Sequence, residues 1–212
     1  MNRRAMIKHM LREYRPALRT LAILPALLLA ACGTGDSQQT AMEPPLAGAA
    51  IGGPFTLVDS DGEQVSWSDF DGKYRVVYFG YTFCPDVCPF EVQKIMQGYE
   101  SFKQAEPELA AQVQPIFITI DPERDTPAKV GEFTKAFSDD LIGLTGTPEQ
   151  VHTAAEAFKV YYQKGETMDG GAYLMDHSNV AYLMSREGEP IALLPIDKDA
   201  QAVAADLERW VS

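Results

Sequence analysis

The chain has 212 residues, which is enough for one well-packed domain with additional segments and too short for two typical domains. A hydrophobic content of 46% and a charged content of 23% are typical of a soluble globular protein. The net charge of -12 argues against nucleic acid as a partner, because phosphate recognition needs a basic surface. This acidity suits a cation or a basic protein surface as a partner, and it is equally explained by solubility alone.

The first 31 residues have the composition of a targeting signal. Six Arg and Lys residues lie within residues 1–20, and an apolar segment over 21–31 follows. This segment is too short for a conventional transmembrane helix, so residues 1–31 are predicted to be a signal peptide. The segment ends in Leu29-Ala-Ala-Cys32-Gly33, which resembles the lipobox of bacterial lipoproteins. The resemblance implies a lipidated Cys32, whereas cleavage of an ordinary signal peptide would leave a free thiol.

Residues 32–53 are rich in Gly, Ser, Gln, Thr, Ala and Pro and are predicted to be a flexible tether. The folded domain is then expected over residues 54–212. A lipidated signal of this kind predicts a location in the bacterial periplasm, with the domain lipid-anchored to a membrane. Such a compartment favours disulfides over free thiols.

The first half of the domain alternates strand patterns with turns. Residues 55–58 and 64–66 are predicted to be short strands joined by a turn at Asp61-Gly62. Residues 74–81 are almost continuously β-branched or aromatic, which indicates a strand buried on both faces of a parallel sheet. Apolar residues at helical spacing over 92–102 then predict an amphipathic helix.

The second half begins with another buried strand, predicted over 116–120. Thr126-Pro127 and Thr147-Pro148 each place a capping threonine before a proline, which predicts the start of a helix at both positions. A glycine-rich insertion near residues 163–173 is expected to form a hairpin. An antiparallel strand pair over 180–194 and a C-terminal helix complete the domain. This order fits an α/β fold of the thioredoxin-like sandwich type, with an N-terminal strand extension and the hairpin insertion.

Cys84 and Cys88 follow the first buried strand, and each is followed by a proline. Because proline disfavours helical conformation in the preceding residue, both cysteines are expected outside regular helix, with the main helix beginning at Pro89. A nearby helix N-terminus favours thiolates, which serve metal binding and disulfide exchange equally well. Redox thioredoxins have two residues between their cysteines, whereas this chain has three, a spacing that can hold two sulfurs around one ion.

Soft thiolates select Cu(I) or Zn(II). A structural zinc site needs four protein ligands, and of the three cysteines only Cys84 and Cys88 are available for it, so two thiolates with one imidazole fit copper better. A structural disulfide between Cys84 and Cys88 would close too small a loop to add much stability.

His177 is the candidate for the imidazole ligand. His9 belongs to the predicted signal, and His152 lies off the apolar stripe of a predicted helix, where a solvated surface role is expected. His177 precedes a predicted strand, and in a thioredoxin-like arrangement its loop faces the dithiol. Met168 and Met175 could donate a thioether, but packing is the usual role of methionine and neither is expected to bind metal.

Four motifs, in this order and spacing, resemble those of the Sco/SenC family of copper chaperones. They are Gly80-Tyr-Thr-Phe-Cys-Pro-Asp-Val-Cys-Pro89, Asp121-Pro-Glu-Arg-Asp-Thr-Pro127, Gly143-Leu-Thr-Gly146 and Asp176-His177-Ser178. The resemblance implies that Cys84, Cys88 and His177 bind one copper ion, as Cu(I), Cu(II) or both. It also implies a metallochaperone without enzymatic turnover that assists assembly of the binuclear copper site of cytochrome c oxidase. Its partners would be the copper-accepting subunit of the oxidase and a thiol reductant or other copper chaperones.

The sequence leaves open whether the dithiol also has a redox role and what the charged residues of 121–125 do. A thiol–disulfide oxidoreductase that reduces cysteines of a copper-accepting protein would use Cys84 and Cys88 as redox-active residues. The absence of proline between Pro148 and Pro190 weakens this alternative, because thioredoxins place a cis-proline opposite their dithiol. The charged residues of 121–125 could tune the site or guide a partner, but a capped, ion-paired turn is the favoured interpretation.

Overall fold

The computed structural model describes residues 42–168 and 170–212. The predicted signal peptide, Cys32 and the first part of the predicted tether lie outside these residues. In the described ranges, no helix combines the length and the apolar character needed to cross a membrane.

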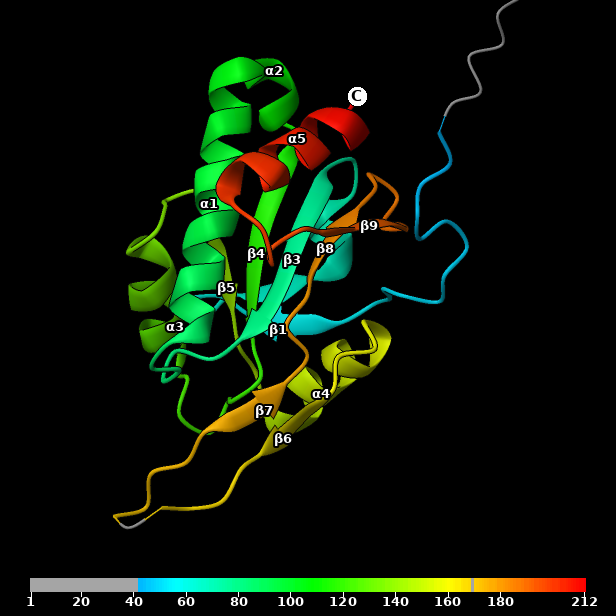
Figure 1. Ribbon diagram of the computed structural model, residues 1–212. Helices are drawn as coiled ribbons and strands as arrows, with labels where there is room; N and C mark the ends of the chain where they lie inside the picture. The colour runs from blue at the N-terminus through cyan, green and yellow to red at the C-terminus, as the bar shows by residue number, and fades with distance from the viewer. Residues whose placement is uncertain (1–41, 169) are drawn as a thin grey trace, which may run out of the picture. The chain divides into compact units, whose positions relative to one another are not determined.

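A mixed five-stranded sheet forms the centre of the domain, with the strand order β5-β4-β3-β8-β9 (Figure 1). Its strands are β3 (Tyr74–Gly80), β4 (Val113–Thr119), β5 (Ile142–Leu144), β8 (Ala181–Met184) and β9 (Pro190–Leu194). The first three run parallel to one another, whereas β8 is antiparallel to β3 and to β9. Every residue of β3 is buried, as its continuous apolar pattern predicts.

Two helices, α1 (Val87–Ala105) and α5 (Ala200–Trp210), lie together across one face of the sheet (Figure 1). Gly98 lies at their contact, where an added Cβ would be only 2.7 Å from the side chain of Val203. The missing side chain therefore lets the two helices approach closely. The short helix α2 (Pro107–Ala110) connects α1 to β4.

The helices α3 (Pro127–Lys135) and α4 (Pro148–Ala157) begin where their capping threonines predict. The Thr126 side chain accepts a hydrogen bond from the Lys129 N–H, and that of Thr147 accepts one from the Gln150 N–H. Pro127 and Pro148 are the first residues of these two helices. Proline has no N–H, but the N–H groups of a first helical turn have no partner within the helix in any case, so proline suits the helix start.

The N-terminal strands β1 (Thr56–Val58) and β2 (Gln64–Ser66) form a separate antiparallel pair, followed by the 3-10 helix η1 (Trp67–Phe70). Phe158, at the end of α4, packs its ring 5.4 Å from the rings of both Trp67 and Phe79. These aromatic contacts attach the N-terminal strand extension to the sheet face opposite α1.

The chain contacts the domain earlier than the predicted domain start at residue 54. The Leu46 N–H donates to the Ile191 carbonyl at 3.0 Å, and the Gly52 N–H donates to the Ala157 carbonyl at 2.9 Å. The last residues of the predicted tether therefore lie against the folded domain.

A second two-stranded sheet, formed by β6 (Tyr162–Lys164) and β7 (Met175–His177), extends from the body of the domain (Figure 1). Gly170 and Gly171 adopt φ values of 87° and 85° near its tip, a conformation that glycine tolerates without strain. The hairpin insertion predicted near residues 163–173 is confirmed. The second strand of this hairpin, β7, ends at His177. His177 therefore lies at the end of a strand rather than in a loop before β8.

Candidate metal and thiol site

The two cysteines lie just beyond the carboxyl end of β3, where α1 begins. Cys84 belongs to the loop before α1, as predicted, but Cys88 lies in the first turn of the helix, which begins at Val87. The prediction that Cys88 lies outside regular helix is therefore wrong. Pro89 occupies the third helical position, where its missing N–H would have no partner within the helix, so it does not delay the helix start. The Cys88 N–H, which also has no partner within the helix, donates to the Sγ of Cys84 at 3.3 Å.

Cys88 is fully buried, whereas Cys84 is partly exposed, and both thiols are free. Gly80, the last residue of β3, leaves room for the inner sulfur. A Cβ at this position would lie 3.4 Å from the Sγ of Cys88 and 2.9 Å from the ring of Tyr78. The glycine thus allows a thiol to sit directly against the end of the strand.

His177 faces this buried thiol from the hairpin. Its Nε2 lies 3.5 Å from the Sγ of Cys88, and its Nδ1 lies 2.9 Å from the carbonyl oxygen of Ser178. Because a carbonyl can only accept, Nδ1 carries the ring proton, and the lone pair of Nε2 points toward the thiol. The rings of Tyr78 and Tyr81 meet the imidazole edge to face, at centroid distances of 6.5 and 6.0 Å. These contacts fix the orientation of the imidazole.

The environments of the three side chains differ in ways that shift their pKa values. Burial raises the pKa of Cys88 to about 12, so its thiol is protonated at neutral pH. Burial also acts to raise the pKa of Cys84, but backbone hydrogen bonds from Cys88 and Asp86 outweigh it and lower the pKa. Burial lowers the pKa of His177, which keeps the imidazole neutral and able to bind a metal.

The structure thus brings Cys88 and His177 into contact, with Cys84 in contact with the Cys88 backbone. Across residues 42–168 and 170–212, no three His, Cys, Asp or Glu side chains are already arranged as a metal site. His152 lies exposed on α4 beside Glu156, as its position off the apolar stripe predicts. Met175 packs against the core and Met168 is exposed.

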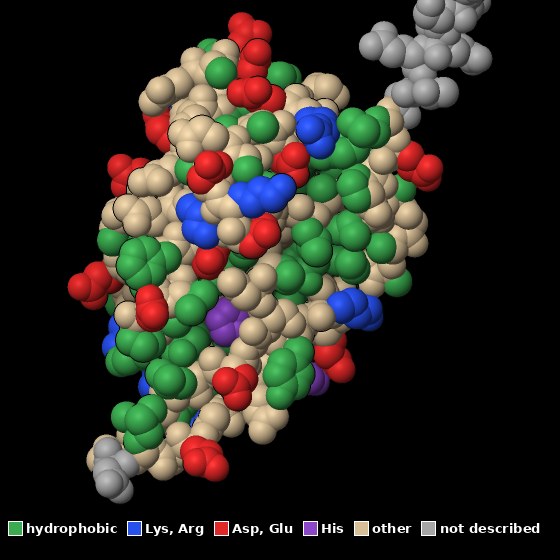
Figure 2. Space-filling view, in the orientation of Figure 1, with side chains coloured by type: hydrophobic (Ala, Val, Ile, Leu, Met, Phe, Trp, Pro, Cys, Tyr) green, Lys and Arg blue, Asp and Glu red, His purple; other side chains and the backbone are tan. Residues whose placement is uncertain are grey.

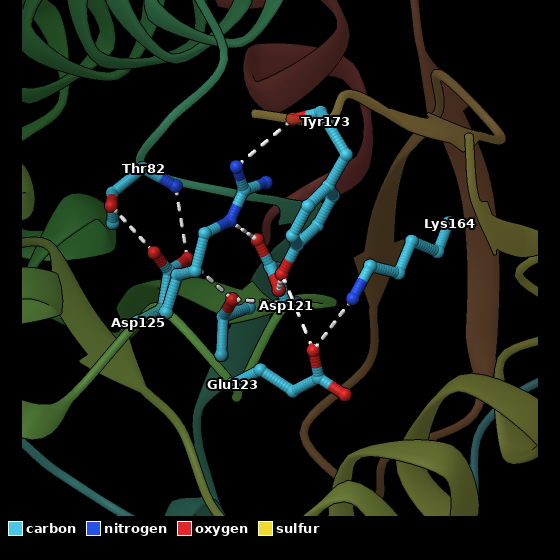
Figure 3. A network of polar contacts seen from close by, with 8 residues as sticks. Thr82, Asp121, Glu123, Asp125, Lys164 and Tyr173 are labelled. Atoms are coloured by element: carbon cyan, nitrogen blue, oxygen red, sulfur yellow. Dashed lines mark hydrogen bonds and ion pairs between the residues drawn. The ribbon is translucent and has the colours of Figure 1, made fainter. Parts of the chain in front are cut away.

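The turn after β4 is ion-paired, as its favoured interpretation predicts. The Arg124 guanidinium pairs with the carboxylate of Asp121. Asp125 is completely buried and accepts hydrogen bonds from the backbone N–H and the hydroxyl of Thr82, in the dithiol loop (Figure 3). Burial raises the pKa of Asp125 despite these hydrogen bonds. The turn therefore contacts the dithiol loop directly.

Tyr173 is the residue of this site that the sequence does not reveal. Its hydroxyl donates to Asp121 at 2.9 Å, and its backbone carbonyl accepts from Arg124 at 2.9 Å (Figure 3). It lies in the hairpin insertion, 49 residues beyond Arg124 and 52 beyond Asp121, and no local pattern signals the contact. Its position two residues before β7 is the only indication of proximity to His177.

Exposed apolar side chains gather around the dithiol. On the face seen in Figure 2, hydrophobic side chains gather in two places, one over the centre and right of the view and one toward the end of the domain that carries the hairpin. The exposed apolar residues of this region include Phe83, Val87, Phe90 and Leu174. Exposed apolar side chains beside a reactive site are typical of a protein interaction surface.

A free dithiol at a helix start, with a neutral imidazole against the buried thiol, defines a thiol-dependent metal-binding or redox protein of thioredoxin-like fold. Comparison with known proteins narrows this class, because a family model described as SCO1/SenC matches residues 43–212. The chain belongs to this family, as its sequence motifs predict.

Two relatives illustrate the similarity in sequence. Protein SCO1 homolog 1, mitochondrial, of Arabidopsis thaliana is 47% identical over 146 residues, which are 68% of this chain and 42% of that protein. Protein SCO2 homolog, mitochondrial, of Mus musculus is 35% identical over 207 residues, which are 93% of this chain and 80% of that protein. The chain therefore spans less than half the length of the Arabidopsis relative.

Solved structures of relatives share the fold. Arabidopsis thaliana ScoI with copper bound has a TM-score of 0.69 and 41% identity, over 74% of this chain and 96% of that one. Bradyrhizobium japonicum ScoI with copper bound has a TM-score of 0.68 and 38% identity, over 76% of this chain and 99% of that one. The predicted thioredoxin-like fold is confirmed, and copper is the metal bound by these relatives.

One prediction is corrected by the comparisons. The location in the bacterial periplasm, with a lipid anchor, is contradicted by relatives whose names assign them to mitochondria in Arabidopsis thaliana, Mus musculus and Homo sapiens. The lipobox resemblance is a short local pattern, whereas the relatives match over most of the chain.

Proposed function

We propose that the chain binds one copper ion through Cys84, Cys88 and His177 and assists assembly of the binuclear copper site of cytochrome c oxidase. The observation that carries the proposal is the 3.5 Å separation between the Sγ of Cys88 and the Nε2 of His177. Metal–sulfur and metal–nitrogen bonds of about 2.3 and 2.0 Å at a tetrahedral angle leave these two atoms roughly 3.5 Å apart. The pair is thus spaced as two ligands of one ion.

The chemistry of the donors supports copper as the cargo. Two thiolates and a neutral imidazole are soft to borderline ligands, which suit Cu(I) and also Cu(II). The lowered pKa of Cys84 favours its thiolate, whereas Cys88 must release its proton as the metal binds. Copper affinity is therefore expected to rise with pH. The copper-bound relatives support the same choice of metal.

The proposed recipient is the copper-accepting subunit of cytochrome c oxidase, on the strength of family membership. The exposed side chains of Phe83, Val87 and Phe90 beside the dithiol offer an apolar surface for such a protein. Cys84 is the partly exposed donor, so it is the ligand that an incoming protein would reach first.

The test is metal analysis and spectroscopy of the purified protein, with variants of each donor. The native chain is expected to bind one copper per molecule, Cys84→Ser and Cys88→Ser to bind none, and His177→Ala to bind about 100-fold more weakly. His152→Ala is the matched control, because this histidine is exposed on α4 and should leave copper binding unchanged. Near-native affinity in His177→Ala would refute the three-ligand site.

A second function, thiol–disulfide exchange, is favoured by the contrast between the thiols. Cys84 is partly exposed with a lowered pKa, and Cys88 is buried with a raised pKa. This is the arrangement of an attacking thiolate and a protected second thiol. The exchange rate with a disulfide substrate should be abolished by Cys84→Ser and unaffected by His177→Ala, which separates this function from copper binding.

A further inference from the structure

The Arg124 guanidinium connects the turn after β4 to the hairpin that carries His177. Its central carbon lies 3.6 Å from the centre of the Tyr173 ring. Tyr173 precedes β7 by two residues, and His177 is the last residue of that strand. A planar guanidinium stacked on an aromatic ring is a favourable contact, and more so when water is largely excluded.

Hydrogen bonds made by both residues reinforce the stack of Arg124 on Tyr173. The Nη1 of Arg124 donates to the Tyr173 carbonyl at 2.9 Å, and its Nε donates to the Asp121 carboxylate. The Tyr173 hydroxyl donates to the other oxygen of Asp121 at 2.9 Å, which closes a ring of three residues (Figure 3). The three side chains are largely buried, with exposed fractions of 2% for Asp121, 8% for Tyr173 and 20% for Arg124.

The same turn also contacts the dithiol loop. The central carbon of Arg124 lies 4.9 Å from the ring centre of Phe83 and 5.8 Å from that of Tyr81. The adjacent residue, Asp125, accepts a hydrogen bond from the Thr82 N–H at 2.9 Å. Two neighbouring residues of one short turn, Arg124 and Asp125, thus contact the loop that leads to Cys84. Arg124 also contacts the hairpin that carries His177.

We infer that Arg124 and Tyr173 are positioning residues that hold the β6–β7 hairpin, and with it His177, against the dithiol loop. This inference rests on the proposed copper function and extends it to residues that do not touch the metal. A two-stranded hairpin is marginally stable by itself, so its position must come from contacts with the rest of the domain. Donors need to be held within about 0.5 Å for tight binding.

Lys164 also contacts the ring of Tyr173, but more weakly than Arg124 does. Its Nζ lies 4.0 Å from the Tyr173 ring centre and 3.0 Å from a carboxylate oxygen of Glu123. The side chains of Lys164 and Glu123 are 46% and 61% exposed, and exposed ion pairs contribute little. Arg124, whose side chain is 20% exposed, therefore makes the stronger of these two contacts with Tyr173.

The test compares Arg124→Lys with the native chain. Lysine keeps the charge but loses the planar stack and the paired donors. In the metal-free protein, amide hydrogens of residues 162–177 are expected to exchange about ten-fold faster in Arg124→Lys, and copper affinity is expected to fall about ten-fold. The matched control is Arg186→Lys, because Arg186 stacks at 4.9 Å on Tyr74 at the opposite end of β3. The control should lower the melting temperature without changing hairpin exchange or copper affinity.

A folded Arg124→Lys protein with native hairpin exchange and native copper affinity would overturn the inference. If this variant does not fold, Tyr173→Phe serves instead, since it keeps the ring and removes only the hydroxyl that donates to Asp121. It is expected to show about three-fold faster hairpin exchange, and native exchange in Tyr173→Phe would equally overturn the inference. Loss of copper binding in the native chain would refute the proposed function, whereas hydrogen exchange tests the role of Arg124 in either case.

Discussion

The polar groups at the two ends of β3 differ in the strength of the hydrogen bonds that they make. At the amino end, Arg75 is completely buried, and its guanidinium lies 4.5 Å from the ring centre of Trp67. The same guanidinium donates to the Ser185 carbonyl at 3.0 Å and to the Asp71 carboxylate at 2.9 Å. These donors are used in fixed contacts between β3, the segment before it and the β8–β9 turn.

At the carboxyl end, the two sulfurs and the Nε2 of His177 have only weak partners. The Sγ of Cys88 lies 3.5 Å from this Nε2, and the Sγ of Cys84 accepts from backbone N–H groups, that of Cys88 at 3.3 Å. A buried donor with fixed acceptors contributes to stability, whereas buried lone pairs without strong partners remain available to a cation. The difference shows which end of the strand serves folding and which end serves binding.

The largest expected effect on stability comes from Arg75→Met. Methionine fills much of the space but leaves the carbonyl of Ser185 without its donor, so the free energy of unfolding should fall by about 3 kcal/mol. Copper binding should keep its stoichiometry, because the substitution lies at the far end of β3. Urea unfolding and copper titration of the same sample measure both quantities. A loss of copper binding in a folded Arg75→Met protein would mean that the two ends are coupled.

Asp125→Ala should have the next largest effect, and it should act at the binding end. The change leaves the N–H of Thr82 and the buried hydroxyl of Thr119 without their acceptor, at a cost of about 2 kcal/mol. The loosened dithiol loop should also reduce copper affinity. Asp125→Asn, which keeps an acceptor oxygen, is the control and should recover most of both losses. Equal effects of alanine and asparagine would contradict this role of Asp125.

The pH dependence of stability should distinguish the two thiols. The pKa of Cys88 is raised from 9.0 to about 12, so its contribution is fully present below pH 9 and is lost as the pH rises toward 12. The loss is about 1.4 kcal/mol per pH unit within this window. The lowered pKa of Cys84 has the opposite sign, since its contribution is present above the ordinary pKa and is lost as the pH falls.

These thiol contributions are measured by unfolding the reduced, metal-free protein at several pH values. Cys88→Ser should be less sensitive to alkaline pH than the native chain, whereas Cys84→Ser should be more sensitive. Parallel profiles for the native chain and both variants would show that the two thiols have similar environments.

Lys164→Met should have the smallest effect. The substitution removes an exposed ion pair and an exposed stack on Tyr173, so the melting temperature should shift by at most about 2 °C. Copper affinity should remain native in a titration beside the Arg124→Lys variant. An equal loss in both variants would mean that the exposed Lys164 holds the hairpin as firmly as Arg124 does.

Local sequence patterns predict the elements of this fold well. The continuous apolar run of β3, the capping threonines of α3 and α4 and the glycines of the hairpin each act within a few residues. Cys88 is the local exception, because the preference imposed by Pro89 is weaker than the tendency of the first helical turn to accept proline.

Contacts between distant residues were harder to predict. The side chains of Cys88 and His177 meet across 89 positions of the chain, and only the resemblance to a known fold indicated that they would. The stack of Arg124 on Tyr173 spans 49 positions and leaves no trace in periodicity or composition. Such contacts depend on how the hairpin folds back over the sheet, which no local pattern encodes.

The placement of His177 on β7 separates one donor from the folding core. β6 and β7 share no ladder with the five-stranded sheet, so a change in the length of the loop that joins them breaks no strand pairing in that sheet. Cys84 and Cys88, in contrast, are built into the junction of β3 and α1. The imidazole is therefore the modular part of the site, and redesign of the hairpin is a route to a different coordination geometry on an unaltered scaffold.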